Sequence, residues 1–87
     1  MIRKHFVFTG KVQHVGFRWR ARKAANRFRC TGWCRNESDG SVTMELQGSK
    51  IRIDLVILAI RSADRIRVDR MDSTVIATVP DEQGFQT

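Results

Sequence analysis

Two short segments of this chain hold residue types that could bind a phosphorylated group. Residues 10–18 read Gly-Lys-Val-Gln-His-Val-Gly-Phe-Arg, and residues 32–36 read Gly-Trp-Cys-Arg-Asn. The first segment is a glycine-flanked loop that leads into a predicted helix, whose start would present unpaired N–H groups and positive potential to an anion. Arg18 adds a planar guanidinium that matches phosphoryl oxygens. Asn36 adds an amide that donates and accepts hydrogen bonds, so it could direct a water molecule at the bound group.

The elements around the first segment are a strand and a helix. Residues 3–12 alternate in polarity and are rich in Phe and Val, which predicts a strand. Gly10 is expected either to bend this strand or to let another group come close. From residue 17 the period changes, and apolar side chains recur at the helical spacing of i, i+4, i+7, i+8 and i+11. They are Phe17, Ala21, Ala24, Ala25 and Phe28.

The second segment lies in a predicted hairpin. Residues 30–36 and 41–47 are expected to be strands, joined by a turn that contains Asp39-Gly40. Residues 50–62 are rich in β-branched side chains, which would also be compatible with a strand. Their length and the spacing of their polar residues favour a helix, and Ser49 is placed to cap it.

The remaining sequence predicts a fourth strand near residues 66–68 and another strand-like run over 74–79, closed by Pro80. The order is therefore βαββαβ with a possible extra C-terminal strand. This order is typical of the α+β ferredoxin-like split βαβ sandwich, in which two helices cover one face of an antiparallel sheet. Residues 1–87 are expected to form one domain.

Charge and hydropathy limit the kinds of partner. The net charge is +7, from 16 basic and 9 acidic residues, which favours anionic partners. Six of the basic residues lie within residues 18–29. No apolar run reaches the roughly 20 residues of a membrane span, and no signal-peptide pattern is present. We therefore expect a cytoplasmic monomer without a membrane partner.

Cys30 and Cys34 are the only cysteines. If both lie on one strand, their Cα atoms are about 13 Å apart, whereas a disulfide needs less than about 7 Å. They are expected to be free thiols. A two-cysteine metal site would need further ligands, and the two histidines, His5 and His14, lie in a different stretch. We expect neither a metal nor another cofactor.

Both segments together resemble the acylphosphatase family. The pattern Gly-x-Val-Gln-x-Val-Gly-Phe-Arg is followed, 18 residues after its arginine, by the asparagine of Gly-Trp-x-x-Asn, with Asp-Gly close behind. Leu46-Gln47-Gly48 and the late Gly84-Phe85 extend the resemblance over nearly the whole chain.

The resemblance implies hydrolysis of the carboxyl-phosphate bond of small acyl phosphates, with inorganic phosphate as a product. In such a site Arg18 would clamp the phosphate together with backbone N–H groups of the loop, and Asn36 would position the attacking water. The loop residues are Gln13, His14, Val15, Gly16, Phe17 and Arg18.

His14 departs from the family pattern, which has glycine there. If that glycine serves a left-handed backbone, another residue in its place costs roughly 1–2 kcal/mol. Histidine tolerates positive φ better than most residues, so the substitution does not exclude activity. A general-base role for His14 is not needed by the family chemistry.

Two other functions fit parts of the sequence. One is an acylphosphatase-like module, catalytically impaired through His14, that binds anions or RNA with its basic helix. The other is an RNA-recognition domain, which shares the βαββαβ order. Such domains stack bases on aromatic side chains of the third strand, and residues 41–46 contain none. We therefore reject the second alternative, and nucleic acid is not the expected partner.

Overall fold

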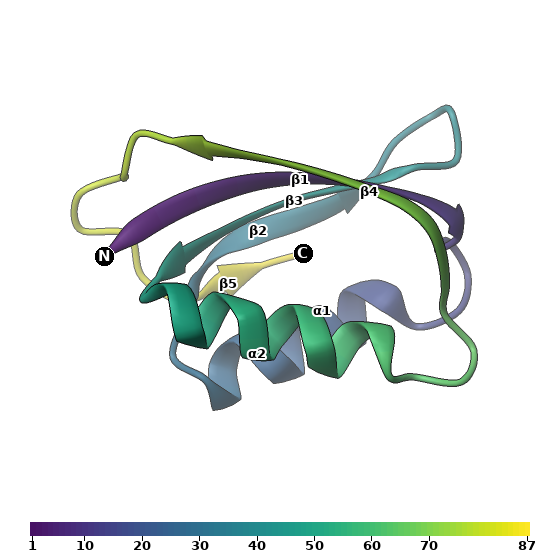
Figure 1. The fold of residues 1–87 in the computed structure, drawn as a ribbon, viewed down its shortest axis with the longest axis horizontal. Coiled ribbons are helices and arrows are strands. Elements are labelled where there is room, and N and C mark those ends of the chain that lie inside the picture. The colour runs from purple at the N-terminus through teal and green to yellow at the C-terminus, as the bar shows by residue number, and fades with distance from the viewer.

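Two helices lie side by side on one face of a five-stranded sheet (Figure 1). The computed structural model describes residues 1–87, and the strand order is β4-β1-β3-β2-β5. This arrangement confirms the predicted α+β ferredoxin-like class. No helix has both the length and the apolar character that crossing a membrane would need. In chain order the elements are β1 (Ile2–Lys11), α1 (Phe17–Arg27), β2 (Thr31–Asn36), β3 (Val42–Gly48), α2 (Lys50–Arg61), β4 (Arg67–Ile76) and β5 (Phe85–Gln86).

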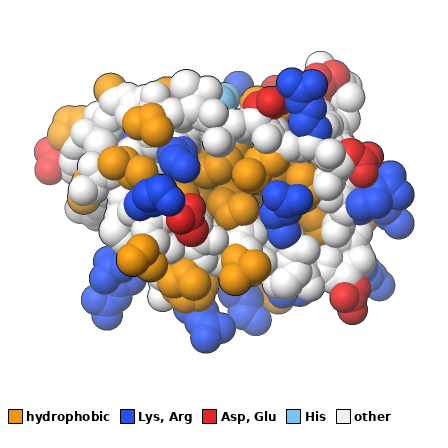
Figure 2. Space-filling model, viewed as in Figure 1, with side chains coloured by type: hydrophobic (Ala, Val, Ile, Leu, Met, Phe, Trp, Pro, Cys, Tyr) orange, Lys and Arg blue, Asp and Glu red, His pale blue; other side chains and the backbone are white.

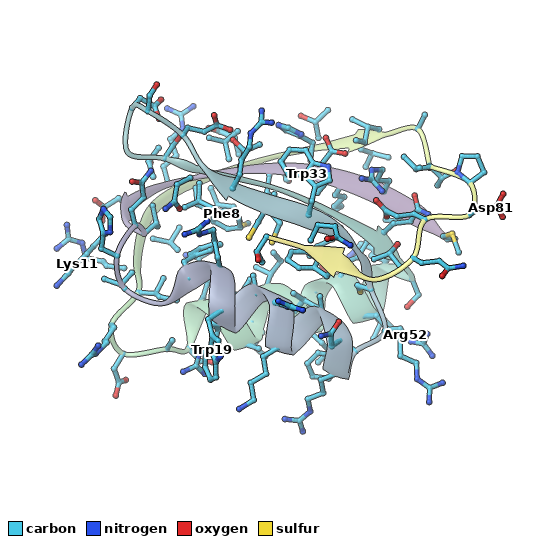
Figure 3. The ribbon with its side chains drawn as sticks, turned by 180° about the vertical axis from the view of Figure 1, so that it is seen from behind. Phe8, Lys11, Trp19, Trp33, Arg52 and Asp81 are labelled. Atoms are coloured by element: carbon cyan, nitrogen blue, oxygen red, sulfur yellow. The ribbon has the colours of Figure 1, made fainter.

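The hydrophobic core fills the space between the sheet and the helices. Phe6 and Phe8 of β1 stack with their ring centroids 5.7 Å apart, and the Phe17 ring lies 4.9 Å from that of Phe8. Figure 3 shows Phe8 between the two layers. Burying each of these rings stabilises the fold by about 1.5–3 kcal/mol. Because Phe17 is the first residue of α1, its burial fixes the start of the helix beside Arg18.

Residues 50–61 form a helix, although their β-branched composition also suited a strand. Ser49 caps it, because its hydroxyl accepts a hydrogen bond from the Arg52 backbone N–H at 3.3 Å. The buried side chains recur at helical spacing and face the core: Ile53, Val56 and Ile60. The outward face carries Ile51, Leu55 and Leu58. Figure 2 shows exposed hydrophobic side chains of the helical layer among Lys and Arg side chains.

The C-terminal third differs from the expectation. The strand predicted near residues 66–68 is longer and continues to Ile76, because its partner β1 is ten residues long and pairs with it as far as Arg3. The run 74–79 is therefore not a separate strand. The extra strand is β5, which pairs with β2 in parallel. All other pairings are antiparallel, so the sheet is mixed rather than wholly antiparallel.

Gly10 marks an irregularity near the end of β1. The register between β1 and β4 shifts between Thr9 and Gly10, and Gly10 has φ 122°. A Cβ atom at this position would collide with the Arg67 carbonyl. The expectation that Gly10 lets another group come close is confirmed, and the close approach is to β4.

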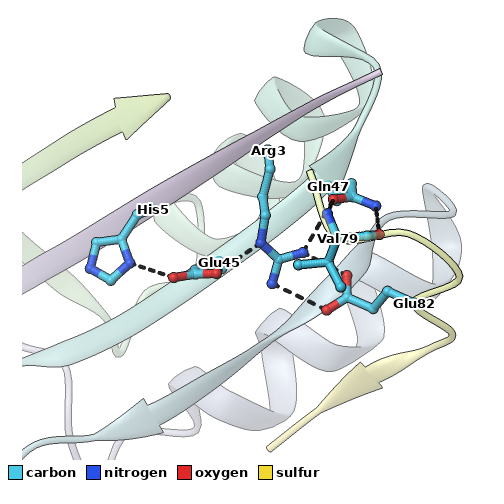
Figure 4. A network of polar contacts seen from close by, with 6 residues as sticks. All are labelled: Arg3, His5, Glu45, Gln47, Val79 and Glu82. Carbon is cyan, nitrogen blue, oxygen red and sulfur yellow. Dashed lines mark hydrogen bonds and ion pairs between the residues drawn. The ribbon is translucent and has the colours of Figure 1, made fainter. Parts of the chain in front are cut away.

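Arg3 is a charged residue inside the fold, with 2% of its side chain exposed (Figure 4). Its guanidinium donates to Glu45 at 2.8 Å and, through two nitrogens, to Glu82 at 2.8 and 3.1 Å. His5 contacts the other Glu45 oxygen at 2.8 Å. Hydrogen bonding to Glu82 is the main cause that raises the pKa of Arg3 above its usual value. This network, the Arg3 cluster, joins β1 and β3 to the segment before β5.

Candidate functional site

The loop between β1 and α1 ends in a helix start that offers free donors. Gly16 is the N-cap, and no side chain caps the helix. The first intrahelical bond runs from the Arg20 N–H to the Gly16 carbonyl at 2.9 Å, so the three preceding N–H groups of the helix have no such partner. No acidic residue lies in the first turn. The positive potential of this helix start is therefore not neutralised locally.

Arg18 and Asn36 line one hollow at this helix start. Its volume is about 200 Å³. Arg18 comes from the first turn of α1, and Asn36 is the last residue of β2. Arg18 is exposed and takes part in none of the seven ion pairs of the structure. The complete lining is Val12, His14, Gly16, Phe17, Arg18, Trp19 and Asn36.

The loop backbone turns through two left-handed residues. His14 has φ 62° and Gly16 has φ 80°. A Cβ atom at Gly16 would meet nothing within 4 Å, so the demand for glycine there comes from the backbone angle alone. His14 adopts the left-handed conformation that glycine would take freely. The structure thus confirms that His14 occupies a position of glycine-like geometry.

Two of the predicted loop residues do not line the hollow. Val15 is half-buried and packs against the hydrophobic core. Gln13 is half-buried too, and its side-chain amide donates to the carbonyls of Glu37 and Ser41 at 2.8 and 2.9 Å. Its side chain therefore contacts the β2–β3 hairpin rather than the hollow.

Comparison with known proteins agrees with this geometry. A sequence model of the acylphosphatase family matches residues 4–87. An acylphosphatase of Geobacillus thermodenitrificans is 36% identical over 87 residues, which is 99% of this chain and 93% of that protein. The chain belongs to the acylphosphatase family. An acylphosphatase of Salinibacter ruber is 46% identical over 65 residues, 74% of this chain and 68% of that protein.

Solved acylphosphatase structures have the same fold. The structure of an acylphosphatase from Coxiella burnetii matches with a TM-score of 0.85 and 29% identity, covering 98% of this chain and 90% of that one. The crystal structure of acylphosphatase from Bacillus subtilis matches with a TM-score of 0.90 over 99% of this chain and 97% of that one. At 23% identity this second match shows the fold alone.

Cys34 lies on β2, two residues before Asn36, and is buried, with 1% of the residue exposed. Burial raises the pKa of its thiol to about 12, although the positive charge of Arg18 acts in the opposite direction. The thiol is therefore protonated at neutral pH and is a poor nucleophile. Cys30, just before β2, is also buried, and both cysteines are free thiols as predicted.

Trp19 and Val12 line the hollow but were not predicted from the sequence. Trp19 directly follows Arg18, so the position of the first helical turn is the signal that could have identified it. The residue is 62% exposed, and the Lys23 ammonium lies 4.9 Å from the centre of its ring. Figure 3 shows Trp19 pointing away from the sheet.

The titratable groups that could bind a metal are scattered. No group of three His, Cys, Asp or Glu side chains is close enough together to hold a metal ion. The carboxylate nearest to Asn36 in sequence is Glu37, where a hydrogen bond from Arg35 is the main cause that lowers the pKa. The polar groups that line the hollow are the Arg18 guanidinium, the helix start, the Asn36 amide, the His14 imidazole and the Trp19 indole, and none of them is a carboxylate.

Proposed function

We propose that this hollow hydrolyses the carboxyl-phosphate bond of small acyl phosphates, with Arg18 and the loop holding the phosphate and Asn36 positioning the water. Membership of the acylphosphatase family supports the reaction class. The observation that carries the residue roles is that Arg18, Asn36 and the first turn of α1 line one hollow, although 18 positions separate the two side chains.

The phosphate is held by the Arg18 guanidinium and by backbone donors of the helix start. The Arg18 guanidinium can bind two phosphoryl oxygens at once, and the N–H groups at the helix start converge on the same anion. Charge on the equatorial oxygens persists through the loose transition state of phosphoryl transfer. Donors that are in place before the reaction stabilise that charge without reorganising.

Asn36 orients the water. Its amide oxygen accepts a hydrogen bond from the water, which aims the water oxygen at phosphorus. As the new P–O bond forms, the bond between phosphorus and the acyl oxygen breaks. One water proton stays on the new P–OH group, and the other passes to a phosphoryl oxygen of the phosphate product. The carboxylate leaves as an anion at neutral pH, because carboxylic acids ionise near pH 4. No general acid is required, and His14 has no proton-transfer role.

The decisive experiment measures hydrolysis of benzoyl phosphate by the wild type, Arg18→Ala and Asn36→Ala. Arg18→Ala should lose both phosphate affinity and turnover, whereas Asn36→Ala should mainly lose turnover. Inorganic phosphate should compete with the substrate, and a chelator should leave the rate unchanged.

Wild-type rates equal to the uncatalysed rate would refute the function. Activity that survives both substitutions would refute the residue assignment. A cytoplasmic monomer stays a prediction.

Two features favour an alternative function, a catalytically impaired module that binds anions or RNA. They are the left-handed backbone of His14 and the basic surface of α1. Binding to RNA through lysines and arginines weakens steeply with salt, because counterions are released. A chain that binds RNA in this way and does not turn over benzoyl phosphate would favour the alternative.

A further inference from the structure

Gln13 connects the two parts of the chain that form the hollow, although its side chain does not line it. These parts are the loop that leads into α1 and the β2–β3 hairpin that carries Asn36. The residue belongs to the loop that carries the phosphate donors. Its amide nitrogen donates to the Glu37 carbonyl at 2.8 Å and to the Ser41 carbonyl at 2.9 Å. Both acceptors belong to the hairpin that follows Asn36. One side chain therefore connects the loop with the strand that supplies the water-binding amide.

The two acceptors lie on either side of the neck of the hairpin. The Glu37 N–H donates to the Ser41 carbonyl at 2.9 Å, and the Gly40 N–H donates to the Glu37 carbonyl at 3.2 Å. Directly below this neck, Asn36 is paired with Val42 in the sheet. Gln13 therefore binds the residue after Asn36 and the residue before Val42.

The hairpin has hydrogen bonds of its own that do not involve Gln13. Asp39 accepts hydrogen bonds from the Ser41 N–H at 2.9 Å and from its hydroxyl at 2.6 Å, and these bonds lower the pKa of Asp39. The helix start is held separately, by the burial of Phe17. Loss of the Gln13 bonds would therefore leave both parts folded and change how they sit relative to each other.

We propose that Gln13 is a positioning residue: its side chain sets the distance between the phosphate cradle and Asn36. This inference rests on the proposed function. The cradle itself, Arg18 with the loop and helix N–H groups, lies wholly on the loop side of the connection. A change at Gln13 should therefore alter turnover and leave phosphate affinity nearly unchanged, since a displacement of 1 Å can cost about 100-fold in rate.

The chain contains a matched control. Gln47 makes the same kind of connection elsewhere, donating to the Val79 carbonyl at 2.9 Å and accepting from the Val79 N–H at 2.7 Å. Gln13→Met removes two such bonds and keeps side-chain length. Gln47→Met keeps side-chain length too but removes three, because Gln47 also accepts a hydrogen bond from the Arg3 guanidinium at 3.3 Å, so it is the more disruptive of the two for the fold. Both should lower the urea midpoint, but only Gln13→Met should lower kcat for acetyl phosphate, by about 10- to 100-fold. The Ki of inorganic phosphate should change less than about threefold in both.

A double variant separates positioning from general loosening. In an Asn36→Ala background Gln13→Met should lower kcat by less than about threefold, because the group that it positions is gone. Three results would overturn the inference: an equal loss of kcat in both backgrounds, a Ki for phosphate that rises as much as kcat falls, or an unchanged kcat. In each case turnover by the wild type would still support the proposed function. A wild type without turnover would overturn both. If Gln13→Met does not fold, Gln13→Asn, whose shorter amide cannot reach both carbonyls, is assessed by the same criteria.

Discussion

Two arginines of this chain are surrounded in opposite ways. Arg3 is buried and held by Glu45 and Glu82, with both carboxylates within 2.8 Å of its guanidinium (Figure 4). Arg18 is exposed at a helix start without acidic residues and has no ion-pair partner in the protein. The first guanidinium is satisfied within the fold, whereas the second remains available to an external anion. The neighbours of an arginine, rather than its residue type, separate a structural role from a binding role.

Arg18→Ala should have the largest effect. We expect kcat/KM for benzoyl phosphate to fall by about 10³-fold or more, because donors that meet the transferring phosphoryl group are worth that much in other enzymes. The free energy of unfolding should stay within about 0.5 kcal/mol of wild type, as for other exposed positions. Steady-state kinetics and urea titration measure both quantities. A large loss of stability would show that Arg18 is also structural and would remove the contrast with Arg3.

Arg3→Met should give the reverse pattern. Removing the guanidinium leaves Glu45 and Glu82 near each other without their shared cation. We expect a loss of about 2–3 kcal/mol in the free energy of unfolding, because both carboxylates keep some access to water. At a temperature where the variant is folded, kcat should match wild type. Urea denaturation followed by the same assay provides the check, and a fall in kcat greater than threefold would contradict it.

The Arg3 cluster also predicts how stability depends on pH. Burial alone would raise the pKa of both Glu45 and Glu82, but hydrogen bonds from His5 and Arg3 to Glu45, and from Arg3 and Thr31 to Glu82, outweigh it. Each pKa therefore lies below its usual value. The resulting stability is present above the ordinary glutamate pKa of about 4.3 and is lost as pH falls through the lowered values. In Arg3→Met the urea midpoint should fall less steeply between pH 7 and pH 3 than in wild type. An unchanged fall would show that other carboxylates cause the loss of stability in acid.

His14→Gly should have the smallest effect. Glycine takes φ 62° without strain, and the relief of roughly 1–2 kcal/mol is partly offset by the greater freedom of glycine in the unfolded chain. Stability should therefore rise by no more than about 1 kcal/mol, and phosphate affinity and turnover should be retained or slightly raised. A general-base histidine predicts loss of activity and of a step near pH 6.5 in the pH–rate profile. Profiles of both proteins distinguish these outcomes.

The sequence predicted best what depends on neighbours along the chain. Helix α2 followed from its spacing and Ser49 despite its β-branched residues, and the family motif indicated both Arg18 and Asn36. The Arg3 cluster was not predicted, because Arg3, Glu45 and Glu82 are brought together only by the register of the sheet and by the chain before β5. The two-residue β5 was missed for the same reason, since its pairing with β2 is not encoded in any local pattern.

That short strand also affects how the molecule meets copies of itself. An uncovered strand edge offers unpaired N–H and C=O groups to any other chain, and so promotes aggregation. β5 covers part of the outer edge of β2, where the Gly32 N–H donates to the Gly84 carbonyl at 3.2 Å and Phe85 is buried. The opposite edge, β4, is left open but carries Arg67–Asp69 and Arg70–Asp72 ion pairs. One edge of the sheet is thus partly covered by main chain, and the other carries charged side chains. Both features disfavour edge-to-edge association.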